Sequence, residues 1–127
     1  MNENIYIDTD LNKNTENIKQ LTLGSFDIVS REFTTVSGVR MCLFFVDGLV
    51  AKQTIHDNII KPCLEASFRI TTVGIKDIVD VLEKLLSAGD VKEDHSLSSC
   101  ITKMLSGDTV LLMDGQNKAL VIQTRGW

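Results

Sequence analysis

Two aspartates, each followed by glycine, come directly after apolar runs and could meet at a ligand. Asp47 follows the run 39–46, and Asp114 follows the run 110–113. If both runs are central strands of an open α/β sheet, the two carboxylates stand at the strand ends where ligands of such sheets gather. Asp-Gly is also ordinary turn chemistry, because both residue types tolerate the backbone angles of a tight reversal. We favour the interpretation as turns, and ligand binding stays open as the alternative.

No residue set for nucleophilic catalysis or metal binding stands out. His56 and His95 are the two histidines, and each lies in a polar context that predicts a solvated side chain. The cysteines lack the spacing of a zinc site, and the eight glycines are too scattered for a phosphate-binding loop. We therefore expect no enzyme activity, no metal and no cofactor.

Three cysteines, an odd number, lie among apolar residues: Cys42, Cys63 and Cys100. This pattern favours buried free thiols in a reducing compartment over the alternatives of disulfides or metal ligands.

Length and charge narrow the class of protein. The 127 residues fit one domain. Seventeen acidic against 13 basic residues give a net charge of -4 without a basic cluster, which argues against a nucleic-acid partner. The apolar runs are far shorter than the roughly 20 residues that cross a bilayer, and the N-terminus is not signal-like. We expect a soluble, unsecreted chain with a flexible tail at 1–12 and a single α/β domain at 13–127.

The first half of the domain predicts one helix and two strands. Asn14 or Thr15 is expected to cap a short helix that ends near Gly24. Residues 26–35 mix apolar and polar side chains, as in a half-exposed edge strand. Residues 39–46 are almost continuously apolar from Met41, as in a central strand.

The middle of the chain changes to a helical period. Apolar residues recur on one face from about Gln53, and Pro62 should kink or end that helix. Residues 66–73 could be a connection or a short strand, and we favour a connection. Helices are expected at 75–86, ended by Gly89, and from Ser96 to Gly107.

The stretch 107–122 predicts a β-hairpin whose strands, 110–113 and 119–122, are joined by a turn at Asp114 and Gly115. Two hairpins joined by two or three helices predict a mixed, roughly four-stranded sheet. A helical crossover between 39–46 and 110–113 would make the two central strands parallel.

Several segments together resemble the N-terminal region of the A subunit of GerA-type spore germinant receptors, over about residues 17–127. The resemblance is carried by NIK at 17–19, FDIVSREF at 26–33, LFFVDGLV at 43–50, IIKP at 59–62 and LSGDTVLLMDG at 105–115. In the family, the segment like QTRGW at 123–127 leads into a second similar subdomain and a membrane-embedded region. The resemblance therefore implies a piece of a longer receptor.

The resemblance also implies a function without catalysis. Such regions are expected to hold a nutrient germinant, an amino acid, sugar or nucleoside, between two subdomains, so this chain would supply half of the cleft. Asp47, Asp114 and Arg125 are the ligand-binding residues that we expect. The implied partners are the receptor B and C subunits, and the implied location is the spore inner membrane, with this domain on the cytoplasmic side. The alternative is an interaction module that passes a signal between subunits without binding the nutrient.

Overall fold

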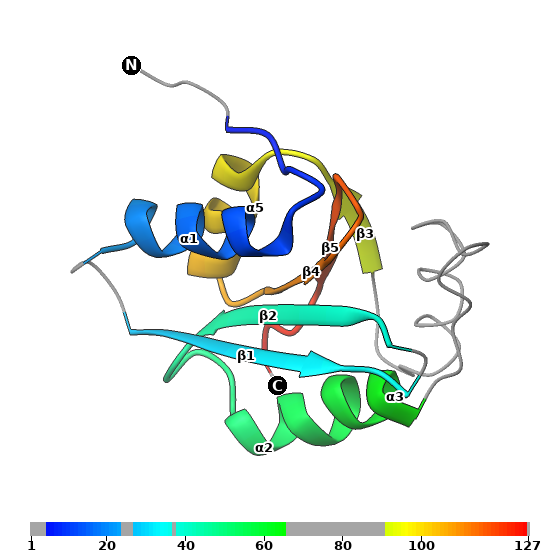
Figure 1. Cartoon of the computed structure of the whole chain (residues 1–127). Helices are drawn as coiled ribbons and strands as arrows, with labels where there is room; N and C mark the ends of the chain where they lie inside the picture. Colours follow the sequence, from blue (N-terminus) through cyan, green and yellow to red (C-terminus); the bar gives the residue numbers. More distant parts are fainter. Residues whose placement is uncertain (1–4, 24–26, 37, 66–90, 127) are drawn as a thin grey trace.

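The computed structural model describes residues 5–23, 27–36, 38–65 and 91–126 of the 127-residue chain. Its centre is one sheet with helices on both faces (Figure 1). The elements in chain order are α1 (Leu11–Leu21), β1 (Ile28–Thr34), β2 (Arg40–Val46), α2 (Lys52–Ile55), the π-helical turn η1 (His56–Ile60), α3 (Lys61–Glu65), β3 (Val91–Asp94), α5 (Leu97–Leu105), β4 (Thr109–Met113) and β5 (Ala119–Ile122).

The α/β class predicted from the sequence is confirmed, but the predicted sheet is wrong in two respects. Within the described residues, the sheet has five strands in the order β1-β2-β4-β5-β3, and each neighbouring pair is antiparallel. The additional strand is β3, which pairs with β5 at one edge. Because β3 adds one more pass across the sheet, β4 runs antiparallel to β2. The predicted parallel relation holds instead between β3 and β4, which α5 connects and β5 separates.

Side chains alternate between two hydrophobic cores, one on each face of the sheet. Leu43 and Leu111 belong to the core beneath α2, η1 and α3, whereas Phe44 and Leu112 belong to the core beneath α1 and α5. Figure 1 shows these two groups of helices on opposite sides of the sheet. Strands β4 and β5 are buried at every position. The apolar runs without alternation therefore predicted correctly that these strands are covered on both sides.

The start of the chain differs from the expected loose tail. Ile7 and Leu11 are buried, and the backbone N–H of Ile7 donates to the carbonyl of His95 at 2.9 Å. Helix α1 begins at Leu11 with Asp10 as its N-cap, four to five positions before the expected caps. Asn14, one of those expected caps, is buried and bonds through its side chain to the backbone of Asp8.

Pro62 does not end its helix. Proline has no N–H to donate, and the helix widens one turn earlier, where the N–H of Lys61 donates to the carbonyl of His56 in η1. Helix α3 then continues to Glu65. The connection expected at 66–73, the helix expected at 75–86 and the helix stop expected at Gly24 lie outside the described residues.

The prediction of buried free thiols is confirmed for all three cysteines. The edge strand, the two central strands, the helix beginning after Ser96 and the 107–122 hairpin are also confirmed.

Candidate functional site

The entry to β4 and the exit from β5 are tied together by a set of side chains that we call the exit clamp: Gly107, Asp108, Thr109, Thr124 and Arg125. The Thr124 hydroxyl donates to the Gly107 carbonyl at 2.7 Å and lies 2.9 Å from the Thr109 hydroxyl. Because the Thr124 hydroxyl has one proton and donates it to Gly107, the Thr109 hydroxyl must donate to Thr124. Both threonines are fully buried, so their hydroxyls meet the need of buried polar groups for hydrogen-bond partners.

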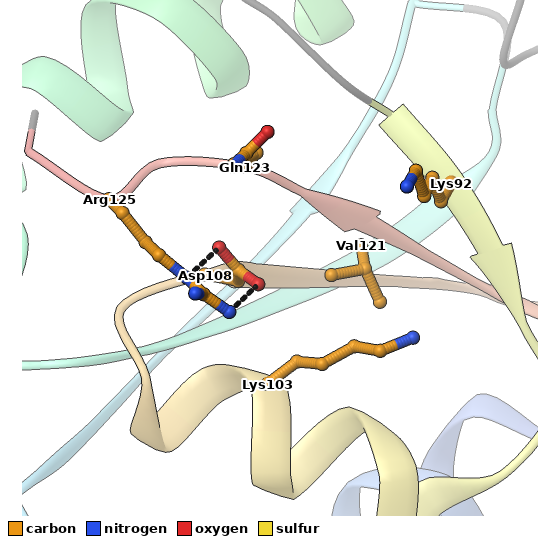
Figure 2. Close-up of a pocket in the computed structure, with 6 residues that line it drawn as sticks. All are labelled: Lys92, Lys103, Asp108, Val121, Gln123 and Arg125. Atoms are coloured by element: carbon orange, nitrogen blue, oxygen red, sulfur yellow. Dashed lines mark hydrogen bonds and ion pairs between the residues drawn. The ribbon is translucent and has the colours of Figure 1, made fainter.

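Arg125 is the charged member of the exit clamp. Its Nε and Nη2 atoms each lie 3.1 Å from a different carboxylate oxygen of Asp108, as Figure 2 shows. The Asp108 side chain is 8% exposed, while that of Arg125 is 52% exposed. A two-pronged pair of this kind fixes the direction of the guanidinium group.

Gly107 makes the close approach to Arg125 possible. Its φ of +105° is a left-handed conformation that residues with a Cβ rarely adopt, and a Cβ there would stand 3.4 Å from Cγ of Arg125. The glycine therefore ends α5 and also leaves room for the arginine.

A hollow of about 250 Å³ lies beside the exit clamp, on the face of the sheet that carries α5. Val121 of β5 is one of its lining residues, and Lys92 of β3 lies directly opposite Val121 in the strand register. Lys103 approaches from the last turn of α5 (Figure 2). The remaining lining residues are Asp108, Gln123 and Arg125.

Lys103 is held in place by Asp94. Its ammonium lies 2.9 Å from Oδ2 of Asp94, which also accepts from the Ser99 hydroxyl at 2.6 Å. Burial raises the pKa of Asp94, but the hydrogen bonds from Ser99, Lys103 and the Ser96 backbone together outweigh it, and the net pKa lies below the ordinary value. Asp94 is therefore a carboxylate at neutral pH.

The structure separates the two aspartates, Asp47 and Asp114, for which the sequence offered a common ligand site. Because β2 and β4 are antiparallel, Asp47, which follows β2, lies near the start of β4. Asp114, which follows β4, lies at the opposite end of the two strands. Arg125 lies at the same end of the strands as Asp47, because β5 ends beside the start of β4. Asp47 is exposed and lies 3.8 Å from the ammonium of Lys52.

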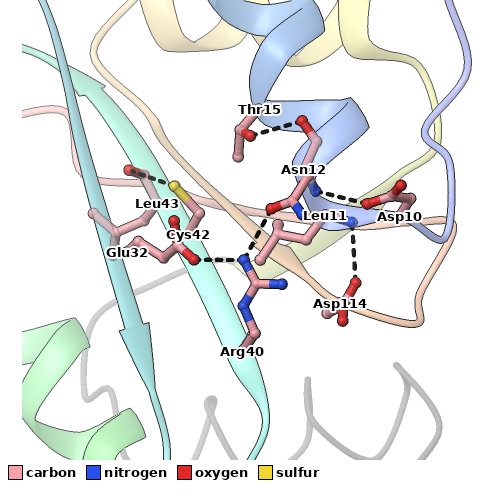
Figure 3. A network of polar contacts seen from close by, with 9 residues as sticks. All are labelled: Asp10, Leu11, Asn12, Thr15, Glu32, Arg40, Cys42, Leu43 and Asp114. Carbon is pink, nitrogen blue, oxygen red and sulfur yellow. Dashed lines mark hydrogen bonds and ion pairs between the residues drawn. The ribbon is translucent and has the colours of Figure 1, made fainter.

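Asp114 has a structural contact. Its Oδ1 accepts from the backbone N–H of Leu11 at 3.0 Å, which satisfies one free donor at the start of α1 (Figure 3). The Arg40 guanidinium stands in the same network and contacts Glu32 at 2.6 Å and Asn12 at 2.9 Å. Ligand binding by Asp114 stays a prediction, but its carboxylate already has a partner within the fold.

Sequence reasoning missed Lys92, Lys103, Asp108 and Gln123. No motif joins them, because they come from four different elements or junctions. Asp108 lies within LSGDTVLLMDG at 105–115, which carried the family resemblance, and Gln123 lies within QTRGW at 123–127, after which the family's chain continues.

The two histidines are exposed, as predicted. Among the described residues there is no group of three or more His, Cys, Asp or Glu side chains that could hold a metal ion. No helix of the described segments is long and apolar enough to cross a bilayer.

The fold, an open sheet with helices on both faces, is that of a solved receptor domain. It matches the N-terminal domain of the A subunit of the Bacillus megaterium spore germinant receptor GerK3 with a TM-score of 0.78 at 24% sequence identity. The match covers 99% of this chain and 50% of that one. The model of the Bacillus/Clostridium GerA spore germination protein family matches residues 16–127, and the chain belongs to this family. The resemblance seen in the sequence is thereby confirmed.

Two proteins of Bacillus subtilis (strain 168) are similar over nearly the whole chain. The membrane protein YfkQ is 30% identical over 125 residues, which are 98% of this chain and 24% of YfkQ. Spore germination protein KA is 29% identical over 124 residues, which are 96% of this chain and 22% of that protein. The chain thus spans about a quarter of the length of these relatives.

Proposed function

We propose that this chain is part of the N-terminal domain of a spore germinant receptor A subunit and forms one wall of a nutrient-sensing cleft. The single observation that carries the proposal is the hollow beside the exit clamp, where polar groups from several elements converge at one edge of the sheet. Family membership and the match to half of the GerK3 domain support it. In this proposal the rest of such a domain closes the hollow, because small-ligand affinity needs enclosure on most sides.

The proposal includes partners and a location. The partners are the B and C subunits of the receptor, and the ligand is a small nutrient such as an amino acid, a sugar or a nucleoside. The parent protein lies in the spore inner membrane with this domain on the cytoplasmic side. The similarity to a membrane protein and to a spore germination protein supports this placement.

The experiment is a germination dose response in spores whose full-length parent protein carries Gln123→Ala, which changes the lining of the hollow, or Asp47→Ala, which removes an exposed carboxylate outside that lining at the same end of the sheet. Both side chains are exposed, so their loss should leave receptor abundance unchanged. The nutrient concentration for half-maximal germination should rise about three- to tenfold, the effect of losing one hydrogen bond of about 1 kcal/mol.

Glu16→Ala, an exposed change on α1, is the matched control and should leave the dose response as it was. Unchanged dose responses for both Asp47→Ala and Gln123→Ala at normal abundance would contradict the cleft. Lowered abundance in both would mean that the two side chains serve folding.

One observation favours the alternative of a signal-transmitting interaction module. Within the described segments, β1 has a strand partner on one side only, and large apolar side chains are exposed beyond the ends of β1 and β2, namely Val36 and Leu49. Exposed strand edges and apolar side chains are common docking features. This alternative predicts that Val36→Ser and Leu49→Ser reduce co-purification of the B and C subunits, while Gln123→Ala does not.

A further inference from the structure

The hollow beside the exit clamp is lined by cations although the chain as a whole is acidic. Among the described residues of the lining, Lys92, Lys103 and Arg125 contribute three positive charges and Asp108 contributes one negative charge. The net charge of the chain is -4. Three cations around one small hollow are therefore not explained by overall composition.

The two ion pairs leave donor capacity in the hollow. An arginine has five N–H donors, and Arg125 uses two atoms, Nε and Nη2, on Asp108. A lysine ammonium has three donors, and Lys103 directs one contact to Asp94. The side-chain ammonium of Lys92 has no hydrogen bond or ion pair with any described residue, so its charge is uncompensated there.

The same ion pairs also fix two of the three cations before any ligand arrives. Asp108 orients Arg125 through two contacts of 3.1 Å, and Asp94 holds Lys103 at 2.9 Å. Preorganised donors cost less entropy on binding than free side chains do. The aliphatic stem of Lys92 and the side chain of Val121 add an apolar surface next to these charges.

We propose that this hollow binds the carboxylate or phosphate group of a small anion, with Lys92 and Lys103 as charge partners and Arg125 as an oriented donor (Figure 2). A volume of about 250 Å³ fits a ligand of roughly amino-acid size. This inference names the ligand chemistry of the proposed nutrient cleft and rests on that proposal for its biological role. Binding of the anion itself is a property of the chain and is tested separately.

The test is an NMR titration of the ¹⁵N-labelled 127-residue chain with sodium acetate and, separately, with sodium phosphate, at constant ionic strength set by sodium chloride. Saturable shifts should cluster at the amides of Lys92, Val121, Gln123 and Arg125. Lys92→Gln should weaken the affinity at least about fivefold, because it removes the uncompensated charge. Lys118→Gln is the matched control: it removes the same charge from a lysine outside the hollow and should change affinity less than about twofold.

Saturation by acetate alone identifies a carboxylate group, saturation by phosphate alone a phosphate group, and saturation by both an anion site that accepts either. Shifts that do not saturate by about 50 mM, or that respond equally to Lys92→Gln and Lys118→Gln, would overturn the inference. Anion binding together with an unchanged germination dose response for Asp47→Ala and Gln123→Ala would leave this site standing and overturn the nutrient cleft.

Discussion

The buried thiols show how strongly the surroundings of a single residue change its chemistry. Burial raises the pKa of Cys63 to about 12, and it does the same for Cys42 and Cys100, where the nearby carboxylates of Glu32 and Asp94 add to the effect. Because the thiolate is the reactive form, we predict that the folded chain reacts with an aromatic disulfide reagent only slowly at pH 8. In denaturing urea all three thiols should react at once. Rapid labelling of the folded chain would contradict the core positions of the cysteines.

Asp94 should make the free energy of unfolding depend on pH in the acid range. Its pKa in the folded chain lies below the ordinary value of 3.8, so its contribution is fully present above that value and is lost as the pH falls through the lower, folded pKa. We predict that Asp94→Asn lowers the free energy of unfolding by about 1–3 kcal/mol at pH 7. Near pH 3 the difference from the unsubstituted chain should shrink.

Urea denaturation at the two pH values measures this effect, with the exposed change Glu16→Gln as the control. An equal loss of unfolding free energy at pH 7 and pH 3 would mean that the negative charge of Asp94 does not contribute to its contacts with Ser99 and Lys103.

At this scale the sequence could predict where strands end but not which ends lie together. Asp47 and Asp114 carry the same local signal, Asp-Gly after an apolar run, yet the antiparallel pairing of β2 and β4 places them at opposite edges. Arg125 was expected at the site from the family resemblance. Its partner Asp108 lies in a junction, and nothing in the local pattern marks a pair that forms across two strands.

Among the elements, α1 shows how a distant residue can determine where a helix begins. Asp10 caps the helix locally through the N–H of Asn12, and Asp114 accepts from the N–H of Leu11 although it lies 103 positions away in the chain. A local reading of helix caps sees only the first of these contacts. The start of α1 therefore falls earlier than the caps expected at Asn14 and Thr15.

We predict that Asp114→Ala lowers the free energy of unfolding by about 1–2 kcal/mol, because it removes an acceptor from the start of α1. Asp114→Asn keeps an oxygen acceptor and should cost less. Thermal melts followed by circular dichroism would show both effects. Equal melting temperatures for Asp114→Ala and the unsubstituted chain would rule out a capping role.

Strand β3 explains why the sheet could not be predicted in full. Of its four residues only Val91 is buried, while Lys92 and Glu93 are exposed and Asp94 is half-buried. A short edge strand needs little apolar surface, so it leaves no alternating pattern to recognise. The buried strands β2, β4 and β5 have long apolar runs, and these were predicted correctly.

At the scale of the whole molecule, both hydrophobic cores contain side chains from the same three strands, β2, β4 and β5. Neighbouring residues of β4 serve opposite faces: Leu111 packs beneath α2, η1 and α3, and Leu112 packs beneath α1 and α5. Both are fully buried. We therefore expect the two faces to unfold together.

Leu111→Ala and Leu112→Ala should each lower the free energy of unfolding by about 2–5 kcal/mol, and each variant should still unfold in a single transition. Urea denaturation followed by circular dichroism and by NMR peak intensities measures both points. Lys118→Ala, on the connection between β4 and β5, should cost less than about 0.5 kcal/mol. Two separate transitions in either leucine variant would show that the faces are independent.

The strand order also has a consequence for folding during synthesis on the ribosome. The pairs β1–β2 and β4–β5 are hairpins that close locally, whereas β2 and β4 join residues roughly seventy positions apart. On the ribosome, β2 is complete long before β4 exists. At a synthesis rate of about 5–20 residues per second, roughly 3 to 13 seconds pass between the completion of β2 and the synthesis of β4. During that interval the nascent chain exposes Met41, Cys42 and Phe44 on a strand paired only with β1, which makes this the period of greatest risk for association between chains.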